Sequence, residues 1–355
     1  MPAPTAKSRR TRWTGIAGLA ISIALIWWAL HDVDIPDVVA QLRGVKLVPF
    51  AATIVLATAM FPLRTLRWRV LLRAEGADLP LAPLWHATAI GFMGNNLLPA
   101  RAGEIARAYA VREMTGVRFT TAVASIAVER VLDGLTLVSF LVLAIWAGGF
   151  RTGTMVGSLP LVGSVTLGGL ASIFGMLFTV ALAGALAVVH WPDTMLRLIG
   201  RLAGRTLPSA LATRLVGLAG GLISGLEALR SPGRFARVLL WSFAVWGVNI
   251  LSFAACFLAF GFELPWAAAP MLASLIAFGV AVPSAPGFFG PFEVTTRLVL
   301  ALYAIPAGDA VSYAIGYHLG TFLPITLLGL WSLGRAGIGF SDLAGASDEG
   351  ERAGD

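Results

Sequence analysis

The sequence predicts an all-α polytopic membrane protein with about eight transmembrane or half-membrane helices, which include re-entrant segments in two inverted pseudo-repeats. The 355 residues are 57% hydrophobic and 13% charged, with a mean hydropathy of +0.81, whereas soluble domains carry about a quarter charged residues. Several apolar runs reach the roughly 20 residues that a membrane-spanning helix needs. No run alternates as the strands of a membrane barrel do, so helices should satisfy the backbone hydrogen bonds within the membrane.

The apolar runs fall into two halves that a basic segment separates. A basic cytoplasmic N-terminus at 1–12 precedes a first membrane half at 13–189, and a cytoplasmic amphipathic linker at 190–237 leads to a second half at 238–335. The cytoplasmic tail at 336–355 is too polar to build a core and is expected to be disordered. Six runs are long enough to cross the membrane: 13–30, 47–63, 121–149, 162–189, 238–260 and 311–333.

Within the linker, basic residues recur at every fourth position. Arg197, Arg201 and Arg205 therefore share one face of a helix. Such a helix suits the surface of an anionic lipid layer. A solvated helix that joins the two membrane halves is the alternative.

The basic residues also predict which side of the membrane each loop occupies. The N-terminal KSRRTRW leads into the first apolar run, so the positive-inside rule places it in the cytoplasm. The second span then ends on the cytoplasmic side at LRTLRWRVLLR. If the run at 81–98 crossed completely, Arg112 and Arg118 would lie outside. A re-entrant segment near 81–118 keeps them on the cytoplasmic side, with most of the 26 Lys and Arg residues.

The region at 266–305 has two interpretations. Apolar runs at 266–282 and 292–304 flank a break that is rich in proline and glycine. They form either two full spans or one re-entrant hairpin that dips in from outside. In both cases the last span ends at Arg335 in the cytoplasm, so both termini are predicted to be cytoplasmic.

Two breaks in the apolar pattern resemble each other. In PARAGE, Gly103 follows Pro99 by four residues, and in PSAPGFFGPFE, Gly287 follows Pro283 by four residues. Paired breaks at corresponding positions in two halves indicate inverted repeats and a central site in transporters. Each break is followed by a glutamate and then an arginine: Glu104 and Arg107 in the first, Glu293 and Arg297 in the second.

These residue types suit an anionic group such as a phosphate. A broken helix exposes backbone N–H groups at a helix N-terminus, and an arginine such as Arg101 can bind a phosphate in a bidentate manner. A glutamate such as Glu104 can neutralise that arginine in the empty site or meet a cationic headgroup. The alternative is that each Glu and Arg form an ordinary pair within one helix. Because the breaks lie in an apolar setting, we favour a site.

A third set of charges, Glu129, Arg130 and Asp133, lies early in the long apolar run at 121–149. Glu129 and Asp133 are one turn apart on one helix face. Charges inside a span usually face a partner or a wet cavity, whereas a helix that begins near Glu129 would place them among the headgroups. The apolar TTAVASIAV before them favours a position inside the membrane.

Other polar residues and the absence of enzyme motifs narrow the function. Asn249, Tyr317 and His318 could line a cavity, but a lone buried polar residue more often bonds a neighbouring helix. Cys256 is the only cysteine, which excludes an intramolecular disulfide, and we expect a buried thiol. The sequence has no HExxH, Walker A or GxSxG motif and no Cys/His cluster, so we expect no enzyme activity, cofactor or metal. The net charge of +7 is dispersed between apolar runs and indicates lipid headgroups rather than nucleic acid.

Four segments, in order, carry a family resemblance: LRTLRWRVLL, GNNLLPARAGEIARAYAV, ERVLDG and PSAPGFFGPFE. Together they resemble the transmembrane domain of the lysylphosphatidylglycerol synthases and its stand-alone flippase-like relatives, over about residues 12–335. The resemblance implies a multi-pass protein of the bacterial inner membrane that is linked to moving lipids between leaflets. Because the chain stops soon after its last span, we expect a stand-alone member without the soluble synthase domain. One departure is Phe288, where a more glycine-rich PGGxGxxE would be expected.

The resemblance, carried over position by position, implies a set of functional residues. These are Arg67, Asn96, Pro99, Arg101, Gly103, Glu104, Glu129, Arg130, Asp133, Pro286, Gly287, Gly290 and Glu293. The pattern of the two breaks adds Arg107 and Arg297 as candidates for substrate binding.

We therefore expect translocation of a lipid or lipid-linked headgroup through a polar central cleft, while the acyl chains stay in the bilayer. The expected partners are membrane lipids, foremost an anionic phospholipid or a lipid-linked headgroup. No ATP-binding motif is present, so movement would be facilitated or ion-coupled, with Asp, Glu and His as candidate proton carriers. One alternative is a lipid-binding or scaffold protein that partners a lipid-modifying or glycosyl transferase. Another is a membrane enzyme that acts on lipid carriers; self-association is left open.

Overall fold

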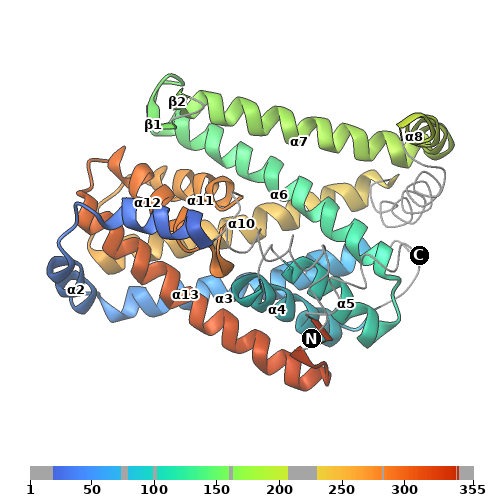
Figure 1. Ribbon diagram of the computed structural model, residues 1–355, viewed down its shortest axis with the longest axis horizontal. Helices are drawn as coiled ribbons and strands as arrows, with labels where there is room; N and C mark the ends of the chain where they lie inside the picture. The colour runs from blue at the N-terminus through green and yellow to red at the C-terminus, as the bar shows by residue number, and fades with distance from the viewer. Residues whose placement is uncertain are drawn as a thin grey trace, which may run out of the picture.

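The computed structural model describes residues 19–72, 79–98, 102–159, 163–206, 230–281, 284–340 and 342–343. Within these residues the chain is an all-α membrane fold with one small β-hairpin, as Figure 1 shows. A first helix, Leu19–Leu30, precedes the labelled elements. These are α2 (Ile35–Arg43), α3 (Leu47–Leu72), α4 (Leu81–Leu97), α5 (Gly103–Thr115), α6 (Phe119–Ala147), β1 (Met155–Leu159), β2 (Gly163–Thr166), α7 (Leu167–His190), α8 (Pro192–Thr206), α10 (Pro232–Phe260), α11 (Ala268–Gly279), η4 (Pro286–Phe288), α12 (Pro291–Ala301) and α13 (Ala307–Ala336).

Five of the described helices are long and apolar enough to cross a membrane by themselves. They are α3, α6, α7, α10 and α13, and they correspond to five of the six predicted long runs. The sixth run, at 13–30, lies partly outside the described residues, and its helix Leu19–Leu30 is bent by 84° relative to α2. The chain is thus a multi-pass membrane protein, as predicted. By length and composition the described helices supply five spans, or six if Leu19–Leu30 and α2 form one bent span, against the predicted eight crossings or half-crossings.

Helix α3 is longer than predicted, which changes the position of its arginines. The sequence predicted a span that ends at residue 63, with Arg64 and Arg67 beyond it on the cytoplasmic side. The helix continues instead to Leu72, and the two arginines are only 3% and 0% exposed. The physical reason is that acidic and polar groups of α6 and α10 lie opposite them, so that burial leaves no bare charge.

The loop between α6 and α7 contains the β-hairpin. Strands β1 and β2 pair in an antiparallel manner, with Met155 opposite Thr166. Helix α7 therefore begins at Leu167 rather than at the predicted residue 162. The Thr166 hydroxyl caps it by accepting a hydrogen bond from the Gly169 N–H at 3.1 Å.

The ends of the long helices gather at two opposite ends of the molecule (Figure 1). At one end, the Lys46 N–H donates to the Ala259 carbonyl at 3.0 Å and so joins α3 to α10. At the other end, Arg230 donates to the Val189 carbonyl at 3.2 Å. Figure 1 places here the ends of α3, α5 and α13, the beginnings of α6 and α10, and α8. We call this second end the arginine-rich end, because these segments contain or adjoin Arg69, Arg112, Arg118, Arg197, Arg201, Arg205, Arg230, Arg234, Arg237 and Arg335.

Helices α4 and α5 form a hairpin that enters from the arginine-rich end and returns to it. The two helices are antiparallel: Gly91 lies against Arg107, and Gly94 lies against Gly103. Figure 1 shows both helices in the half of the molecule near that end. An antiparallel pair of this kind is the arrangement expected for the re-entrant segment predicted near 81–118.

Helices α11 and α12 form a second hairpin, which enters from the opposite end. Gly279 of α11 lies against Thr295 of α12, and the Tyr303 hydroxyl donates to Met271 at 3.5 Å. The helices have 12 and 11 residues, which makes each about 18 Å long or less, too short for a membrane core of about 30 Å. The structure therefore favours one re-entrant hairpin at 266–305 over two full spans.

The tips of the two hairpins meet near the middle of α13. The Asn96 amide of α4 donates to Thr326 at 2.8 Å, and His318 of α13 contacts the Gly287 carbonyl at 2.7 Å. Helix α4 also packs directly against η4. The two hairpins thus point toward each other from opposite ends, which is the arrangement that inverted repeats produce.

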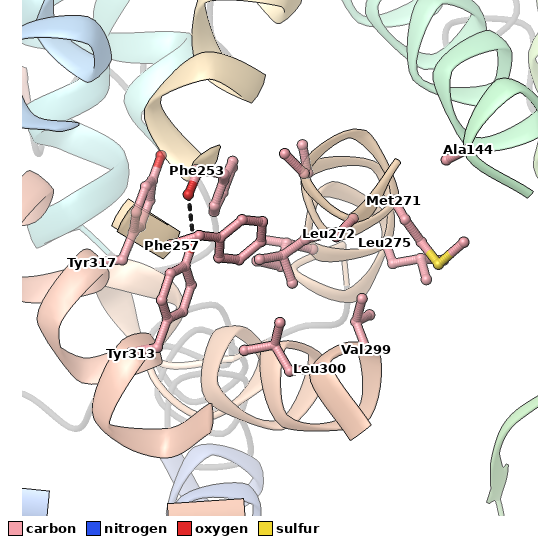
Figure 2. Packing of buried hydrophobic residues seen from close by; sticks show 14 of the residues in the cluster. Ala144, Phe253, Phe257, Met271, Leu272, Leu275, Val299, Leu300, Tyr313 and Tyr317 are labelled. Carbon is pink, nitrogen blue, oxygen red and sulfur yellow. Dashed lines mark hydrogen bonds between the residues drawn. The ribbon is translucent and has the colours of Figure 1, made fainter. Parts of the chain in front are cut away.

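A hydrophobic core holds the second hairpin in place (Figure 2). Phe257 of α10, Leu272 of α11 and Leu300 of α12 gather around Tyr313 of α13. The Tyr313 hydroxyl donates to the Phe253 carbonyl at 3.0 Å, so the buried polar group is satisfied.

Two shorter helices, α2 and α8, lie at opposite ends of the molecule (Figure 1). Helix α8 contains the predicted basic face, and Arg197, Arg201 and Arg205 are all exposed on it. In Figure 1, α8 is viewed along its axis, whereas α7 is viewed from the side. The two helices therefore run in different directions, as expected if α7 crosses the membrane and α8 lies along its surface. The rest of the predicted linker at 207–229, the basic N-terminus at 1–12 and most of the tail at 336–355 lie outside the described residues.

Candidate functional site

Charged side chains from three helices meet inside the bundle. Four are arginines and three are carboxylates, which gives a formal net charge of +1. We call this group the charge cluster. It consists of Arg64 and Arg67 of α3, Glu104 and Arg107 of α5, and Glu129, Arg130 and Asp133 of α6.

Asp133 is the central anion of the charge cluster. It accepts a short hydrogen bond from Arg67 and a 2.9 Å hydrogen bond from the Trp246 indole N–H of α10. Arg130 and Arg64 lie 3.2 and 3.5 Å from its second oxygen. One carboxylate thus contacts three guanidinium groups, which makes burial of those positive charges tolerable.

Glu129 is the second buried anion. It accepts a 2.6 Å hydrogen bond from Arg107, and Arg67 lies 3.5 Å from it. The Arg107 guanidinium also lies 3.7 Å from the centre of a Trp68 ring, in a cation–π contact. Trp68 in turn donates to the Ser125 hydroxyl at 2.8 Å. The ion pair of Arg107 therefore joins α5 to α6, rather than two residues of one helix.

Most of the charge cluster is sealed from solvent. The exposed fractions are 3% for Arg64, 0% for Arg67, 4% for Arg107, 0% for Glu129 and 3% for Asp133. Loss of one partner from such a buried network leaves a bare charge and costs about 3–5 kcal/mol. In this conformation these five side chains are buried and bind one another between α3, α5 and α6.

Glu104 and Arg130 differ from the rest, because their side chains are 36% and 40% exposed. The Arg130 Nε lies 3.5 Å from the Glu104 carboxylate. At about 1.5 Å per residue, each lies about 17 Å from the arginine-rich end of its helix, at Thr115 in α5 and Phe119 in α6. That is about half the depth of a membrane core. Charged residues inside a membrane span usually face one another, a polar partner or a water-filled cavity.

A second polar site lies at the tip of the second hairpin. The His318 Nδ1 lies 2.6 Å from Glu293 Oε1, and its Nε2 lies 2.7 Å from the Gly287 carbonyl oxygen. The other Glu293 oxygen accepts a hydrogen bond from the Gly290 N–H at 2.7 Å and so caps α12. Glu293 and His318 are both 7% exposed, and the Phe289 ring stacks on the imidazole.

The glycines at the two hairpin tips allow close approaches and backbone angles that a larger residue would prevent. A Cβ on Gly103 would lie 2.0 Å from the Gly91 carbonyl oxygen and 2.4 Å from the Asn95 nitrogen. Only glycine therefore lets α4 and α5 approach this closely. Gly290 has φ = 99°, and a Cβ there would lie 2.9 Å from the Ser22 carbonyl oxygen. These predicted site residues shape the breaks rather than offering side chains to a ligand.

Two other predicted residues lie away from both polar sites. Arg297 donates to Asp32 at 2.5 Å and to the Ala29 carbonyl at 2.8 Å, toward the end opposite the arginine-rich end. The hydrogen bond from Arg297 lowers the pKa of Asp32 below its usual value. Asn96 joins α4 to α13, as described above. Arg101, the remaining candidate in the first break, lies outside the described residues.

The sequence did not reveal Arg64, Ser242 and Trp246 as members of the polar network. Arg64 precedes Arg67 by one helical turn and so shares its face, a spacing that could have revealed it. Ser242 accepts a hydrogen bond from Arg67 at 2.9 Å, and Trp246 lies one turn further along α10. Nothing in the local sequence distinguishes these two from ordinary helix residues.

The other polar residues that the sequence analysis considered make contacts between helices. Asn249 donates to Met60 at 3.7 Å, and the hydroxyls of Tyr317 and Ser252 lie 2.7 Å apart. Cys256 is a buried free thiol, as predicted. The simpler explanation therefore fits these residues, whereas His318 belongs to the second polar site.

Comparison with known proteins matches most of this chain to one family model and to several relatives. The family described as the lysylphosphatidylglycerol synthase TM region matches residues 15–329. Glycosyltransferase AglD of Haloferax volcanii is 28% identical over 335 residues, which are 88% of this chain and 53% of AglD. The chain thus spans about half the length of that relative. A UPF0104 membrane protein of Methanothermobacter thermautotrophicus is 25% identical over 91% of this chain and 93% of its own length, and the UPF0104 membrane protein PH1989 of Pyrococcus horikoshii is 23% identical over 88% and 93%.

Proposed function

We propose that this chain, which belongs to the family of the lysylphosphatidylglycerol synthase transmembrane region, moves the headgroup of a lipid or lipid-linked molecule between the leaflets of a bacterial inner membrane. The single observation that carries the proposal is the partly exposed pair of Glu104 and Arg130, each about 17 Å along its helix from the arginine-rich end. The proposed activity is transport without a cofactor, rather than catalysis.

A charged headgroup that crosses the membrane meets the same barrier as a charged side chain placed there. Each such charge costs at least about 2.5–3.5 kcal/mol at the centre of a membrane helix. A binding site at half depth lowers this barrier because it replaces water. Arg130 can bind a phosphate through its guanidinium, and Glu104, released from Arg130, can meet a cationic part of the same headgroup.

The buried part of the charge cluster supports this role of Arg130. Asp133 lies 3.2 Å from one Arg130 nitrogen and is itself held by Arg67. The guanidinium is therefore positioned before any ligand arrives, so a ligand does not have to order it. The formal excess of positive charge in the cluster favours an anionic headgroup.

The two hairpins suggest how access could alternate. A headgroup that reaches Glu104 from the arginine-rich end still has the tip of the second hairpin between it and the other end. Translocation then requires the two tips, which meet at α13, to move relative to each other. The acyl chains would remain in the bilayer throughout.

Charge distribution suggests the orientation. The arginine-rich end belongs in the cytoplasm under the positive-inside rule, which also places both termini there. The expected partners are an anionic phospholipid or a lipid-linked headgroup.

The test uses purified protein in liposomes that contain fluorescently labelled phosphatidylglycerol, with a membrane-impermeant quencher that reports label in the outer leaflet. Wild-type protein should move the label, and Glu104→Gln should lower the initial rate about tenfold or more, the equivalent of about 1.4 kcal/mol. The matched control is Glu113→Gln, because Glu113 lies on the same helix, is 44% exposed and is close to the arginine-rich end.

Thermal unfolding establishes that both variants are folded. A wild-type protein that moves neither labelled phosphatidylglycerol nor a labelled lipid-linked sugar phosphate would overturn the proposed function. Equal rates for Glu104→Gln and wild type would remove Glu104 from the site.

A second candidate function is lipid binding in partnership with a transferase. The observation that favours it is the match to a protein named as a glycosyltransferase, of which this membrane region covers 53%. Stable binding of labelled lipid without movement, together with specific co-purification of a transferase, would favour this alternative.

A further inference from the structure

The hydrogen-bond partners of Glu293 and His318 determine how many protons the two side chains hold together. The Gly287 carbonyl oxygen can only accept, so the His318 Nε2, 2.7 Å away, must carry a hydrogen and donate it. The Glu293 Oε2 accepts a hydrogen bond from the Gly290 N–H. Only the 2.6 Å contact between Nδ1 and Oε1 remains to be assigned.

That contact needs one proton between its two atoms. Without it, a lone pair of Nδ1 would face a lone pair of Oε1 at 2.6 Å, an arrangement that repels. With the proton, the pair is either an imidazolium beside a carboxylate or a neutral imidazole beside a carboxylic acid. Both forms carry one proton more than a neutral histidine and a carboxylate, and both have zero net charge. The pair in this geometry therefore holds one exchangeable proton.

Other ionisable groups lie on the elements that pack around this pair. Helices α2 and α3 place Leu42 and Phe50 against Gly316 and Gly320 of α13, and the nearby Arg43 and Lys46 are exposed. The described parts of Leu19–Leu30, α11 and η4 contain no titratable side chain. In α12, Arg297 donates a hydrogen bond to Asp32. In α13, Tyr317 is bonded to Ser252, while Asp309 and Arg335 lie more than two turns from His318. His86 of α4 lies against Trp331, far along α13.

We propose that Glu293 and His318 form a proton-binding site whose occupancy controls the second re-entrant break, so that lipid movement is coupled to a proton. This proposal rests on the transport function proposed above. With the proton bound, the pair joins the N-terminus of α12 and the Gly287 carbonyl to the middle of α13. When the proton leaves to water, Nδ1 and Oε1 repel each other, this link opens, and the tip of the second hairpin is released from α13.

The placement fits a coupling role. His318 lies two turns before Thr326, which holds the end of α4 through Asn96. The proton site and the first hairpin therefore contact the same part of α13. The end of α4 in turn packs on Gly103, which precedes Glu104 of the proposed headgroup site. Movement of the second tip against α13 can therefore reach that site, whose ion pair of Glu104 and Arg130 does not include the proton-binding pair.

The decisive variant is Glu293→Gln. A glutamine amide oxygen can still accept from the Gly290 N–H, and its NH2 group can donate to Nδ1 of a neutral His318 that still donates to Gly287. All the hydrogen bonds are thus retained, but the exchangeable proton is absent. Folding should persist, and thermal unfolding checks this. His318→Gln is the second variant, and His190→Gln, at the exposed end of α7, is the matched control.

The first measurement detects the proton without any transport. Nuclear magnetic resonance of protein in lipid nanodiscs at neutral pH should show a far-downfield proton signal from the short Nδ1···Oε1 hydrogen bond. The signal should be present in wild type and in His190→Gln, and absent from Glu293→Gln and His318→Gln. A wild-type spectrum without this signal, or a signal that survives both variants, overturns the proton site.

The second measurement tests the coupling in liposomes that contain labelled phosphatidylglycerol and an internal pH-sensitive dye. A difference of one pH unit should bias the final distribution of the label about tenfold in wild type if one proton moves with each lipid. Label movement should carry protons in wild type, and Glu293→Gln should move label, if at all, without bias and without protons. Wild-type movement that ignores the pH difference overturns the coupling while the transport function stands. If wild type moves no lipid, the transport function and the coupling both fail, and the resonance measurement still decides whether the proton site exists.

Discussion

The two re-entrant hairpins share one plan but differ in the charges at their tips. Each places a glutamate in the first turn of its second helix, Glu104 in α5 and Glu293 in α12. Glu104 meets Arg130, and arginine keeps its positive charge in proteins. Glu293 meets His318, and histidine is the residue type that most readily gains and loses a proton near neutral pH.

This difference separates two tasks within one repeated arrangement. A permanent positive charge suits the binding of an anionic headgroup, because the site then has the same charge in every step. An exchangeable proton suits the control of a moving part, because it can add or remove one contact. The charge cluster also ties the first hairpin to α3 and α6, whereas aromatic and aliphatic packing holds the second hairpin.

The largest expected effect comes from Asp133→Asn, which should destabilise the packing of the first hairpin against α3 and α6. Three guanidinium groups would lose their shared anion in a buried setting, so the free energy of unfolding should fall by about 3–5 kcal/mol. Thermal unfolding followed by tryptophan fluorescence measures the change, since the chain has 11 tryptophans. Asp193→Asn, on the exposed part of α8, is the control. Equal melting temperatures for wild type and Asp133→Asn would contradict a structural role for the cluster.

A slightly smaller effect is expected for Gly103→Ala. The added Cβ would meet backbone atoms of Gly91 and Asn95, which cannot rotate away, so about 2–3 kcal/mol of stability should be lost. Gly184→Ala in α7 is the control, because a Cβ there meets nothing within 4 Å. The same unfolding measurement applies, and a Gly103→Ala protein as stable as wild type would refute the close packing of the first hairpin.

Gly290→Ala tests the second hairpin in the same way. Its positive φ is strained for alanine, and the nearest backbone neighbour of the new Cβ is 2.9 Å away, so a loss of about 1–2 kcal/mol is expected. Gly233→Ala, where a Cβ is unobstructed, is the control. If Gly290→Ala proved more harmful than Gly103→Ala, the first hairpin would not be the more tightly constrained of the two.

The smallest effect concerns Asp32, which joins the second hairpin to the end of the first helix through Arg297. Because Arg297 lowers the pKa of Asp32 in the folded protein, the pair stabilises the fold above the ordinary carboxyl pKa of about 4. This contribution is lost as the pH falls through the lowered value. Wild type should therefore melt slightly above Asp32→Asn at pH 7, and the difference should shrink progressively as the pH falls below about 4. Asp37→Asn, on exposed α2, is the control, and a difference that grows in acid would contradict the sign.

The membrane spans and the first re-entrant hairpin were predictable because they depend on local properties. Apolarity over about 20 residues determines whether a helix can cross. The arginines after residue 98 favoured re-entry of 81–98, because a full crossing would place them on the wrong side. The similarity of PARAGE and PSAPGFFGPFE likewise predicted two facing breaks, and the tips of both hairpins contact α13.

The partners of the charges were not predictable. The spacing of Glu104 and Arg107 allowed a pair within one helix as the alternative to a site, but Arg107 binds Glu129 and Glu104 meets Arg130. Arg64 and Arg67 looked like the end of a helix, since a run of charges has the same sequence signature whether it meets water or buried carboxylates. Only the position of Asp133, on another helix, distinguishes the two cases.

By itself, the sequence determined that this is a multi-pass helical membrane protein with two inverted breaks, because apolarity and charge bias act along the chain. The tertiary structure decided which charges are sealed and which are accessible, and it set the contact on which the proposed proton site depends. Those properties depend on distances between side chains that are far apart in sequence, as in the 2.6 Å contact between Glu293 and His318. Local sequence patterns do not encode such distances, whereas the packing of helices sets them.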